Sequence, residues 1–544
     1  MKEILFDKQR CEGELGYELD RLFDSRKGEK GVKITFKKDL YELYPEFCAE
    51  KCLCISNHGW NGIKRIAILI EEMEDLEIDF CGSVLRCHGV MTLIAVIGSK
   101  NVNIKNLTLE NPETMLMECR VVAEGNDYVD LLPLRGREQF AVRDGALVIQ
   151  YTECIFPMLT HVEFDGETGE IVRGTGDNSL GISLKNAKVC EIDGNILRVF
   201  GVKRFPPIGN VIVINGSRRL GAGIFAEDSR DITLENIRVD SCLGMGLLAQ
   251  TCENITLRSF NTQRKEGYYY TANADATHFV NCTGVVDVRD CLFEGQLDDA
   301  LNVHGIYTRI VSVSDDCILV KEMHPQATGI KIYGVGDLVG IVDSESLIPY
   351  QKKRITAVKY VNSQIVRLEF AEGTEGIRVG DDVENLDRRC DLIFKNNVVR
   401  NNRARGMLIA TKRALIENCR FHTSGTAIMF EASGDHWYES GTTEEIIIQN
   451  NEFDRCKHGT WGHAVIECCP RRKVEEGKYF HGSISVQGNR FLTEHTWLVR
   501  FDNVKNVSYQ ENIVLCEPSE TPKITLSHVE GVYIDKTFEN VENI

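Results

Sequence analysis

The sequence lacks long apolar runs and has no excess of positive charge. No stretch approaches the ~18 apolar residues of a membrane-spanning helix. Its 63 Lys and Arg residues against 81 Asp and Glu residues leave a net charge of −18, whereas a nucleic-acid partner requires a basic surface. The first residues, MKEILFDKQR, are too charged for a secretory signal peptide. We therefore expect a cytoplasmic protein that binds neither membranes nor nucleic acids.

Proline is scarce, and the cysteines lack metal-type spacing. With 11 prolines and 43% apolar residues, the composition is that of an ordered globular protein. The 20 cysteines are scattered, many of them in apolar stretches such as NCTGVVDVRDCLF, and a reducing compartment would leave them as small buried hydrophobes. Neither Cys52 with Cys54 nor Cys468 with Cys469 has a partner pair at zinc spacing. We predict no metal site and no cofactor.

What the sequence does contain is a repeated eight-residue pattern of alternating apolar residues. Alternation with period two is typical of a strand with one buried face. Three copies recur after 23, 22 and 23 residues (232 to 255, 392 to 414, 484 to 507). The full copies in the central and C-terminal part are ITLENIRV (232–239), VDVRDCLF (286–293), LIFKNNVV (392–399), ALIENCRF (414–421), IIIQNNEF (446–453), ISVQGNRF (484–491) and VSYQENIV (507–514).

This recurrence selects an architecture. A period of 22–23 residues is too short for a strand–helix–strand unit. It fits one rung, that is, one turn of a parallel β-helix, whose rungs stack about 4.8 Å apart. The Asn residues near the fifth or sixth position are expected at the corners, because Asn tolerates left-handed backbone and can stack in ladders. The predicted fold class is all-β, built on a parallel β-helix.

A capping helix and two insertions complete the predicted organisation. Leu15, Leu19, Leu22 and Phe23 fall at helical spacing, so a short amphipathic helix is expected to cover the open end of the stack. One interruption contains hairpin patterns, and the other contains short strands typical of a small antiparallel barrel. The predicted segments are 1–30 (capping segment), 31–112 (first rungs), 113–204 (inserted β-rich domain), 205–304 (central rungs), 305–389 (inserted β-barrel), 390–516 (C-terminal rungs) and 517–544 (last rung and tail).

Three aspartates form the candidate catalytic group. Asp298 and Asp299 are adjacent in EGQLDDALNVHG, and Asp275 lies 23 residues before Asp298 (298 − 275), which is one rung. The three carboxyl groups should therefore share one face, where mutual repulsion raises at least one pKa. One protonated and one ionised carboxyl group are what glycosidic hydrolysis requires. A calcium site and a turn-capping role are the alternatives for these residues.

Candidate substrate contacts surround this group in the sequence. Asn302 and His304 follow the aspartates, although a histidine is often simply packed and hydrogen-bonded. Arg403 and Arg405 either pair with the acidic surface or reach a substrate hydroxyl. Aromatic rings beside acids suit the apolar faces of a sugar, although a tryptophan can also seal a core. The candidate substrate-binding residues are Asn302, His304, Arg405, Glu431, Trp437 and Glu439.

Several motifs resemble glycoside hydrolase family 110, the α-1,3-galactosidases. They are SNHGWNGIKRIAILIEEMEDLEID (56–79), GMGLLAQTCENITL (244–257), ADATHFVNCTG (274–284), GQLDDALNVHG (295–305) and WYESG (437–441). One segment, IDFCGS at 78–83, has Phe and Cys where a turn such as Asp-Gly-x-Gly is expected.

The resemblance implies a right-handed parallel β-helix carrying β-barrel insertions. It also implies exo-acting, metal-independent removal of terminal α-1,3-linked galactose with inversion. Asp298 would be the general acid, and Asp275 and Asp299 would hold and deprotonate the attacking water. One-rung spacing does not distinguish the carboxyl separations of inverting and retaining enzymes, so inversion comes from the resemblance.

Three other functions fit a β-helix with clustered acids. A polygalacturonase-like hydrolase would act on an anionic substrate, yet the DDALNVHG neighbourhood offers no basic run. A lyase would need calcium and a strong base. A non-catalytic glycan-binding β-helix would bind galactosides without turnover. The expected partner is a carbohydrate with terminal α-galactose, and exposed rung edges together with the resemblance favour a homodimer.

Overall fold

The fold is described from a computed structural model of the chain. It covers residues 1–543 except positions 12, 60, 136–138, 152–153, 217, 469–474, 494–496, 517–520, 536–537 and 539–540.

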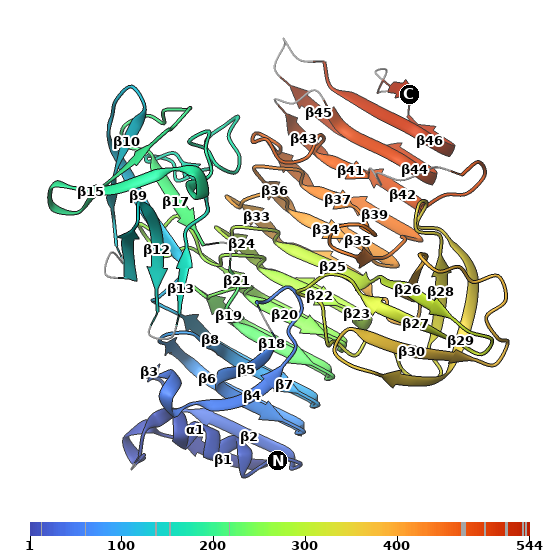
Figure 1. Cartoon of the computed structure of the whole chain (residues 1–544), viewed down its shortest axis with the longest axis horizontal. Helices are drawn as coiled ribbons and strands as arrows, with labels where there is room; N and C mark the ends of the chain where they lie inside the picture. Colours follow the sequence, from blue (N-terminus) through green and yellow to red (C-terminus); the bar gives the residue numbers. More distant parts are fainter. Residues whose placement is uncertain are drawn as a thin grey trace.

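The body of the molecule is a parallel β-helix, in which the strands of successive rungs stack into columns (Figure 1). One column of strands forms the face that carries the aspartates, and each member pairs in parallel with the next. In spatial order this site face consists of β5 (Gly62–Glu71), β7 (Thr92–Ile97), β18 (Ile224–Glu227), β20 (Leu247–Gln250), β22 (Thr277–Val280), β25 (Leu301–Ile306), β34 (Met407–Ile409), β37 (Ile428–Phe430), β41 (Ile466–Cys468), β44 (Trp497–Gln510), β46 (Lys523–Ile534) and β47 (Val541–Asn543).

A second column runs the length of the helix on another face. Its strands contain the repeated eight-residue pattern, whose apolar positions point into the core. They are β1 (Lys2–Phe6), β2 (Lys30–Phe36), β6 (Glu74–Cys87), β8 (Lys100–Glu110), β19 (Arg230–Val239), β21 (Glu253–Thr262), β23 (Thr283–Arg289), β32 (Asp391–Lys395), β35 (Arg413–Glu417), β39 (Glu445–Gln449) and β42 (His481–Gln487), followed by parts of β44 and β46.

A third, shorter column closes each rung. It contains β3 (Leu40–Leu43), β24 (Leu292–Glu294), β33 (Val398–Arg400), β36 (Arg420–His422), β40 (Glu452–Asp454), β43 (Arg490–Thr493) and β45 (Ile513–Cys516).

Like residues stack on like residues inside the helix. The final Phe residues of four repeats form one ladder together with Phe394, with ring centroids 4.8–6.3 Å apart from Phe293 through to Phe491. Asn396, Asn418 and Asn450 take positive φ at the corners, as predicted for these positions. The repeat therefore encodes both the buried stack and the corners between its faces.

The predicted helix caps the N-terminal end of the stack. α1 (Leu15–Asp24) buries Leu19 and Phe23 in the same core cluster as Ile34 and Ile78. Next to it, β4 (Ala49–Leu53) pairs antiparallel with β5. Among the described residues, no helix has the length and apolarity needed to cross a membrane.

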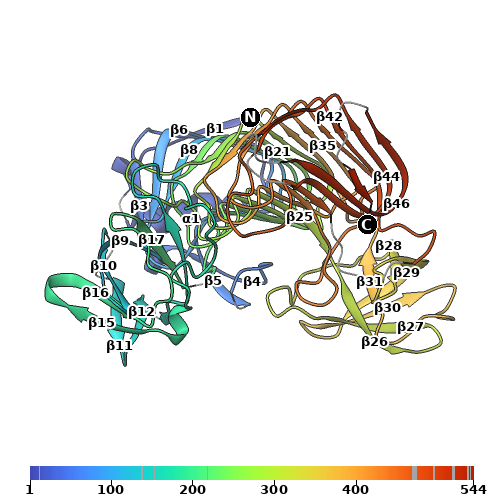
Figure 2. The same ribbon diagram turned by 90° about the horizontal axis from the view of Figure 1, so that it is seen from above.

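Two antiparallel insertions project from one side of the β-helix, on either side of β25 (Figure 2). The first holds a six-stranded sheet, in the order β14 (Thr160–Phe164), β17 (Val211–Asn215), β9 (Leu116–Glu124), β10 (Tyr128–Pro133), β16 (Ile196–Phe200) and β15 (Lys188–Ile192), and a three-stranded sheet of β11 (Phe140–Arg143), β12 (Ala146–Gln150) and β13 (Ile155–Pro157). The sheet takes in β17, so the strands of the first insertion run on past residue 204 to Asn215.

The second insertion is a closed barrel, as its strand pattern predicted. Its strands follow the order β26 (Thr308–Val313), β27 (Cys317–Glu322), β30 (Ile365–Phe370), β29 (Pro349–Tyr360), β28 (Leu338–Val342) and β31 (Asp382–Asn385). Together with the parallel stack and the helix cap, it confirms the predicted fold class.

Candidate active site

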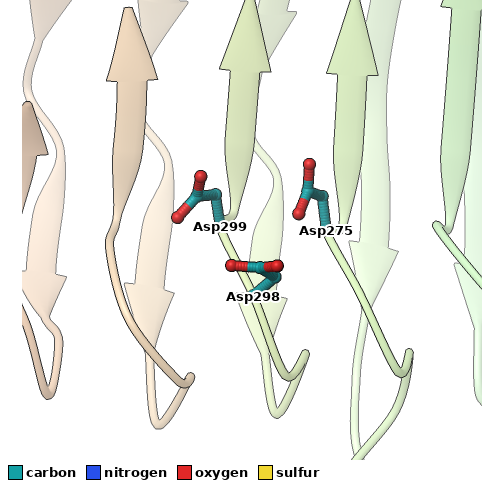
Figure 3. Close-up of side chains that lie close together, drawn as sticks. All are labelled: Asp275, Asp298 and Asp299. Carbon is teal, nitrogen blue, oxygen red and sulfur yellow. The ribbon is translucent and has the colours of Figure 1, made fainter. Parts of the chain in front are cut away.

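The three aspartates converge at the start of two neighbouring strands (Figure 3). Asp275 precedes β22, and Asp298 and Asp299 precede β25, with which β22 pairs in parallel. One carboxylate oxygen from each of the three lies within 4.8 Å of the others. The backbone fixes this register, because the N–H of Ala276 donates to the carbonyl of Asp299 at 2.9 Å. The one-rung spacing thus brings the group together as predicted.

Three arginines surround the aspartates. Arg219 and Arg403 donate to opposite oxygens of Asp298 at 3.0 and 3.1 Å. Arg405 donates through Nε to Asp299 at 2.9 Å. The trio of oxygens is close enough to enclose a cation, but the three guanidinium groups already lie against Asp298 and Asp299.

In the part of the chain that the structure describes, the side chain of Asp275 is hydrogen-bonded to a histidine and not to an arginine. The Nδ1 atom of His278 lies 2.6 Å from Oδ2 of Asp275, and its Nε2 atom lies 3.0 Å from Nε2 of His304. Nδ1 of His304 lies 2.7 Å from the carbonyl oxygen of Gly305, and its Nε2 lies 3.5 Å from Glu439. A continuous hydrogen-bonded chain therefore leads away from Asp275.

Burial controls the protonation of this group. It raises the pKa of Asp275 to about 8, with a further contribution from the charge of Asp298. It also raises the pKa of Asp299 to about 8, against the opposing charge of Arg405. Asp298 is the least buried of the three, with 16% of its side chain exposed. The group therefore retains at least one carboxyl proton at neutral pH.

The neighbouring ionisable groups shift in the opposite sense. Burial lowers the pKa of His278 well below its usual value. Burial alone would raise the pKa of Glu439, but the imidazoles of His304 and His278 outweigh it and hold that pKa below its usual range.

A cavity of about 920 Å³ opens over the aspartates. Most of the predicted substrate-binding residues line it, namely Asn302, Arg405, Glu431, Trp437 and Glu439. His304 is placed differently, since it lies behind His278 and is 5% exposed. The structure thus brings five of the six candidates to the cavity wall.

Two of these wall residues have features of a sugar site. The Oδ1 atom of Asn302 is buried without a hydrogen-bond partner among the described residues, and such an atom gains by accepting a bond from a ligand hydroxyl. Trp437 is 38% exposed and stacks on His324 of the second insertion, with ring centroids 4.7 Å apart. It presents a ring to the cavity and does not seal the core.

The cavity is closed on the N-terminal side. His278 follows Leu248, Phe225 and Ala95 in one row across the site face. These three side chains are fully buried in an apolar cluster beneath Leu53 and Ile55. Sugar-sized space therefore begins at His278 and extends only toward the C-terminal rungs.

Comparison with known proteins identifies the group to which the chain belongs. It is 32% identical over 521 residues to "Alpha-1,3-galactosidase B" of Parabacteroides distasonis, spanning 91% of this chain and 84% of that protein. It is 28% identical over 509 residues to "Alpha-1,3-galactosidase A" of Shewanella woodyi, spanning 91% and 82%. The chain belongs to the α-1,3-galactosidase family. The resemblance to glycoside hydrolase family 110 is therefore confirmed.

The family is also recognised in both insertions. Residues 117–212 match the model "GLAA-B beta-barrel domain I", and residues 317–383 match "GLAA-B beta-barrel domain II". Among solved structures, the A-module of a mannuronan C-5 epimerase from Azotobacter vinelandii is similar with a TM-score of 0.41 at 10% identity, covering 96% of this chain and 94% of that module.

The basic residues of the site lie outside the DDALNVHG neighbourhood, which has no basic run. Arg219, Arg403 and Arg405 line the cavity. They come from segments far from the aspartates in the chain. Each is paired with an aspartate of the site, and Arg403 binds Asp177 as well, at 2.7 Å.

Some site residues escaped the sequence-based search. Asn57 and His278 lie in motifs that resemble the family, but the pattern of the strands gave neither a role. Asn57 reaches the cavity because Gln250 binds the backbone of Cys54 and Ser56, which holds the preceding loop against the β-helix. Trp461 lines the opposite wall, and no repeat or motif signalled it.

Proposed function

We propose that this protein is an exo-acting α-1,3-galactosidase that removes terminal α-1,3-linked galactose with inversion at the anomeric carbon. One observation carries the proposal: three aspartates lie together at the closed end of a cavity in a member of this family. Both relatives described above are named α-1,3-galactosidases.

The aspartates supply the acid and the base of a glycosidic hydrolysis. Asp298, the most exposed of the three, is assigned to protonate the leaving oxygen. Asp275 and Asp299 start neighbouring strands and are assigned to hold the attacking water and take its proton. Acid and base of this kind each contribute roughly 10²–10⁴-fold to the rate.

The protons of the trio belong to the group as a whole. Carboxyl groups this close titrate together, so a proton retained at neutral pH is available to whichever member the substrate favours. The raised pKa values of Asp275 and Asp299, both about 8, supply the retained proton. The arginines beside Asp298 and Asp299 stabilise the anion that remains.

The closed N-terminal side supports exo action. A chain passing through the site would collide with the apolar cluster under Leu53 and Ile55. A terminal sugar can fill the closed end against Asn302 and Glu439, with the rest of the glycan leading toward the C-terminal rungs. Only a chain end satisfies both conditions.

The test is NMR of the sugars released from a linear α-1,3-galactobioside, followed from the first turnover. We expect free galactose that appears first as the β-anomer, and no release from the α-1,4- and α-1,6-linked isomers. Release of the α-anomer first would overturn inversion. Binding without release of galactose would indicate a glycan-binding protein that has no catalytic activity. Internal cleavage of longer chains would exclude exo action.

A further inference from the structure

The cavity extends well beyond the aspartates along the site face. Asn302 pairs with Leu408, Leu408 with Met429, Met429 with Glu467, and Glu467 with Arg500, each on the next strand. Four strand steps of about 4.8 Å span roughly 19 Å. All five residues line the same cavity. We call the part beyond Asn302 the C-terminal arm.

The chemistry changes along this arm. Leu408 and Met429 form an apolar step directly after Asn302. Glu467 and Arg500 follow, and Glu467 accepts hydrogen bonds from the backbone and the imidazole of His463 at 2.7 and 2.8 Å. An apolar step followed by polar groups matches the alternating apolar faces and hydroxyls of linked sugars.

An aromatic wall stands beside the arm. Trp461 lines the cavity, and its Nε1 atom donates to Asp177 of the first insertion at 3.3 Å. Arg403, which binds Asp298, lies 5.7 Å from the ring of Trp461. Arg403 therefore contacts both the assigned acid and the aromatic wall of the arm.

We propose that the C-terminal arm binds the leaving-group glycan, and that the natural substrate is a galactose-terminated oligosaccharide of more than two sugars. This rests on the proposed function and names its substrate class. The sugar next to the scissile bond lies over the Leu408–Met429 step. Later sugars contact Trp461 and the polar end at Glu467 and Arg500.

The experiment compares kcat/KM for a galactobioside with that for a tetrasaccharide ending in the same α-1,3-linked galactose. We expect the tetrasaccharide to be preferred about tenfold or more. Arg500→Gln should lower kcat/KM for the tetrasaccharide by about threefold to tenfold and leave that for the galactobioside nearly unchanged. Trp461→Leu should lower the value for the tetrasaccharide by about threefold to tenfold more than the value for the galactobioside. Trp497→Leu is the matched control, because Trp497 is 38% exposed at the start of the strand that carries Arg500.

Equal effects of the substitutions on both substrates, or no preference for the longer substrate, would contradict the proposal that the C-terminal arm binds the leaving-group glycan. Calorimetric binding to Asp298→Asn separates this outcome from a failure of the proposed function, because it needs no turnover. Tighter binding of the tetrasaccharide supports the arm even if no hydrolysis occurs. Equal binding of both sugars contradicts it.

A second inference comes from the chain of Asp275, His278 and His304, here called the Asp275 relay. Among the residues that the structure describes, Nδ1 of His304 contacts the carbonyl of Gly305 alone, so it must carry a proton. Nε2 of His304 and Nε2 of His278 face each other at 3.0 Å, so one of the two must carry a proton. Nδ1 of His278 also lies 2.6 Å from Oδ2 of Asp275. If Asp275 were ionised and both imidazoles were neutral, there would be one proton too few for all three contacts to be hydrogen bonds. The relay therefore holds one extra proton.

Three arrangements satisfy the contacts among Asp275, His278, His304 and Gly305. The one with the extra proton on His304 also leaves Nε2 of His278 able to accept from Nδ2 of Asn57 at 3.3 Å. The extra proton resides on Asp275, on His278 or on His304, and two of these arrangements leave Asp275 as an anion. Moving between them breaks the O–H bond of Asp275 and forms N–H at Nδ1 of His278. A further shift breaks N–H at Nε2 of His278 and forms it at Nε2 of His304. Atoms and charge balance without any external proton.

We infer that His278, oriented by His304, is a positioning residue that holds the proton of Asp275 while this carboxylate accepts one from water. The inference rests on the proposed function. Several other ionisable groups face Asp275 or His278 from the elements packed around them. They are Asp298, Asp299, Arg219, Arg405 and Glu439.

The pH profile tests the relay. In His278→Leu, Asp275 must lose its proton to solvent before it can act, and burial keeps its pKa raised. The ratio of kcat between variant and wild type should therefore be lowest near pH 6 and rise up to about tenfold per pH unit toward pH 8. KM should stay nearly constant. His304→Gln, which keeps an acceptor, should retain far more activity than His304→Leu.

Two controls make this result decisive. His481→Leu removes a fully buried imidazole that binds Thr443 instead of the aspartates, and it should leave the profile unchanged. A pH-independent loss in His278→Leu would indicate a merely structural role and overturn the inference. ¹⁵N NMR of the His278 imidazole reports the shared proton in an inactive protein too, so it separates this inference from the proposed function.

Discussion

Two ladders of polar side chains in this molecule stack in the same way and differ in outcome. At one corner, Asn451, Asn489 and Asn512 lie one rung apart, and each side chain donates to the next at 3.0 Å or to a backbone carbonyl at 2.8–3.0 Å. At the active site, Asp275 and Asp299 also lie one rung apart, but carboxylates cannot donate to each other. The site instead depends on arginines, a histidine and retained protons.

The difference follows from hydrogen-bonding capacity. An amide carries both donor and acceptor, so stacked amides satisfy one another and stabilise the fold. Stacked carboxyl groups share a proton or repel, and that unsatisfied arrangement is available for chemistry. The β-helix register supplies both, because it places equivalent side chains about 4.8 Å apart.

The largest effect should come from making the active-site ladder resemble the asparagine ladder. Asp298→Asn removes the assigned acid while keeping the shape of the side chain. We expect kcat to fall by roughly 10³-fold, with the binding constant for the galactobioside within about threefold of wild type. Retained turnover would remove Asp298 from the acid role. Asp435→Asn, at an exposed position of the cavity rim, controls for loss of a nearby charge.

The converse change should destabilise the fold. Asn489→Asp places a carboxylate where a 1% exposed amide donates to Asn512 and to Ile448. We expect a loss of about 3 kcal/mol in the free energy of unfolding at pH 8. The loss should shrink near pH 4, where the carboxyl group is neutral, as followed by urea denaturation.

Asn506→Asp is the control for that experiment, because Asn506 is exposed at another corner. It should change the free energy of unfolding by less than about 0.5 kcal/mol. Equal losses in both variants would show that burial does not distinguish the two corners.

Neutralising one of the buried aspartates of the site should stabilise the protein in alkaline solution. The pKa of Asp275 is raised in the fold to about 8, so its stabilising contribution is present at low pH and is lost as pH rises toward 8. Asp275→Asn stays neutral throughout. We expect the variant to exceed wild type by roughly 1–2 kcal/mol at pH 8 and to match it near pH 4 by thermal denaturation. A variant that is less stable than wild type at pH 8 would contradict the raised pKa of Asp275.

The smallest effect concerns the corner position next to the asparagine ladder. Asn396 takes a φ of 57° and makes an exposed contact with Asp290. Asn396→Gly keeps that backbone without strain and should change the free energy of unfolding by less than about 0.5 kcal/mol. Asn451→Gly, within the ladder, should cost about 2 kcal/mol more. Similar costs would mean that corner geometry, and not amide pairing, sets the difference.

The repeat period accounts for what the sequence could predict. It places the strands, the corner asparagines and the meeting of Asp275 with Asp298, because all depend on one regular spacing. It carries no information on loops that reach the site from elsewhere. Arg219 and Asn57 arrive on such loops, and Trp461 is held by Asp177 of an insertion. The covering of Phe225 by Leu53 also depends on tertiary packing, so the closed end of the cavity was not predictable.

The closed barrel leaves and rejoins the β-helix through neighbouring strands. Thr308 of β26 pairs with Val383 of β31, and Val285 pairs with Asp391 across the whole intervening segment. Because its two ends lie side by side, the barrel can be exchanged as a unit. Replacing the barrel with a shorter hairpin would remove His324, whose ring packs against Trp437. The strands that follow Asp275 and Asp299 would keep their register. Gln326 of the barrel also accepts a hydrogen bond from the backbone N–H of Asn57 at 2.8 Å, so the exchange would alter the cavity wall at Trp437 and at Asn57 together.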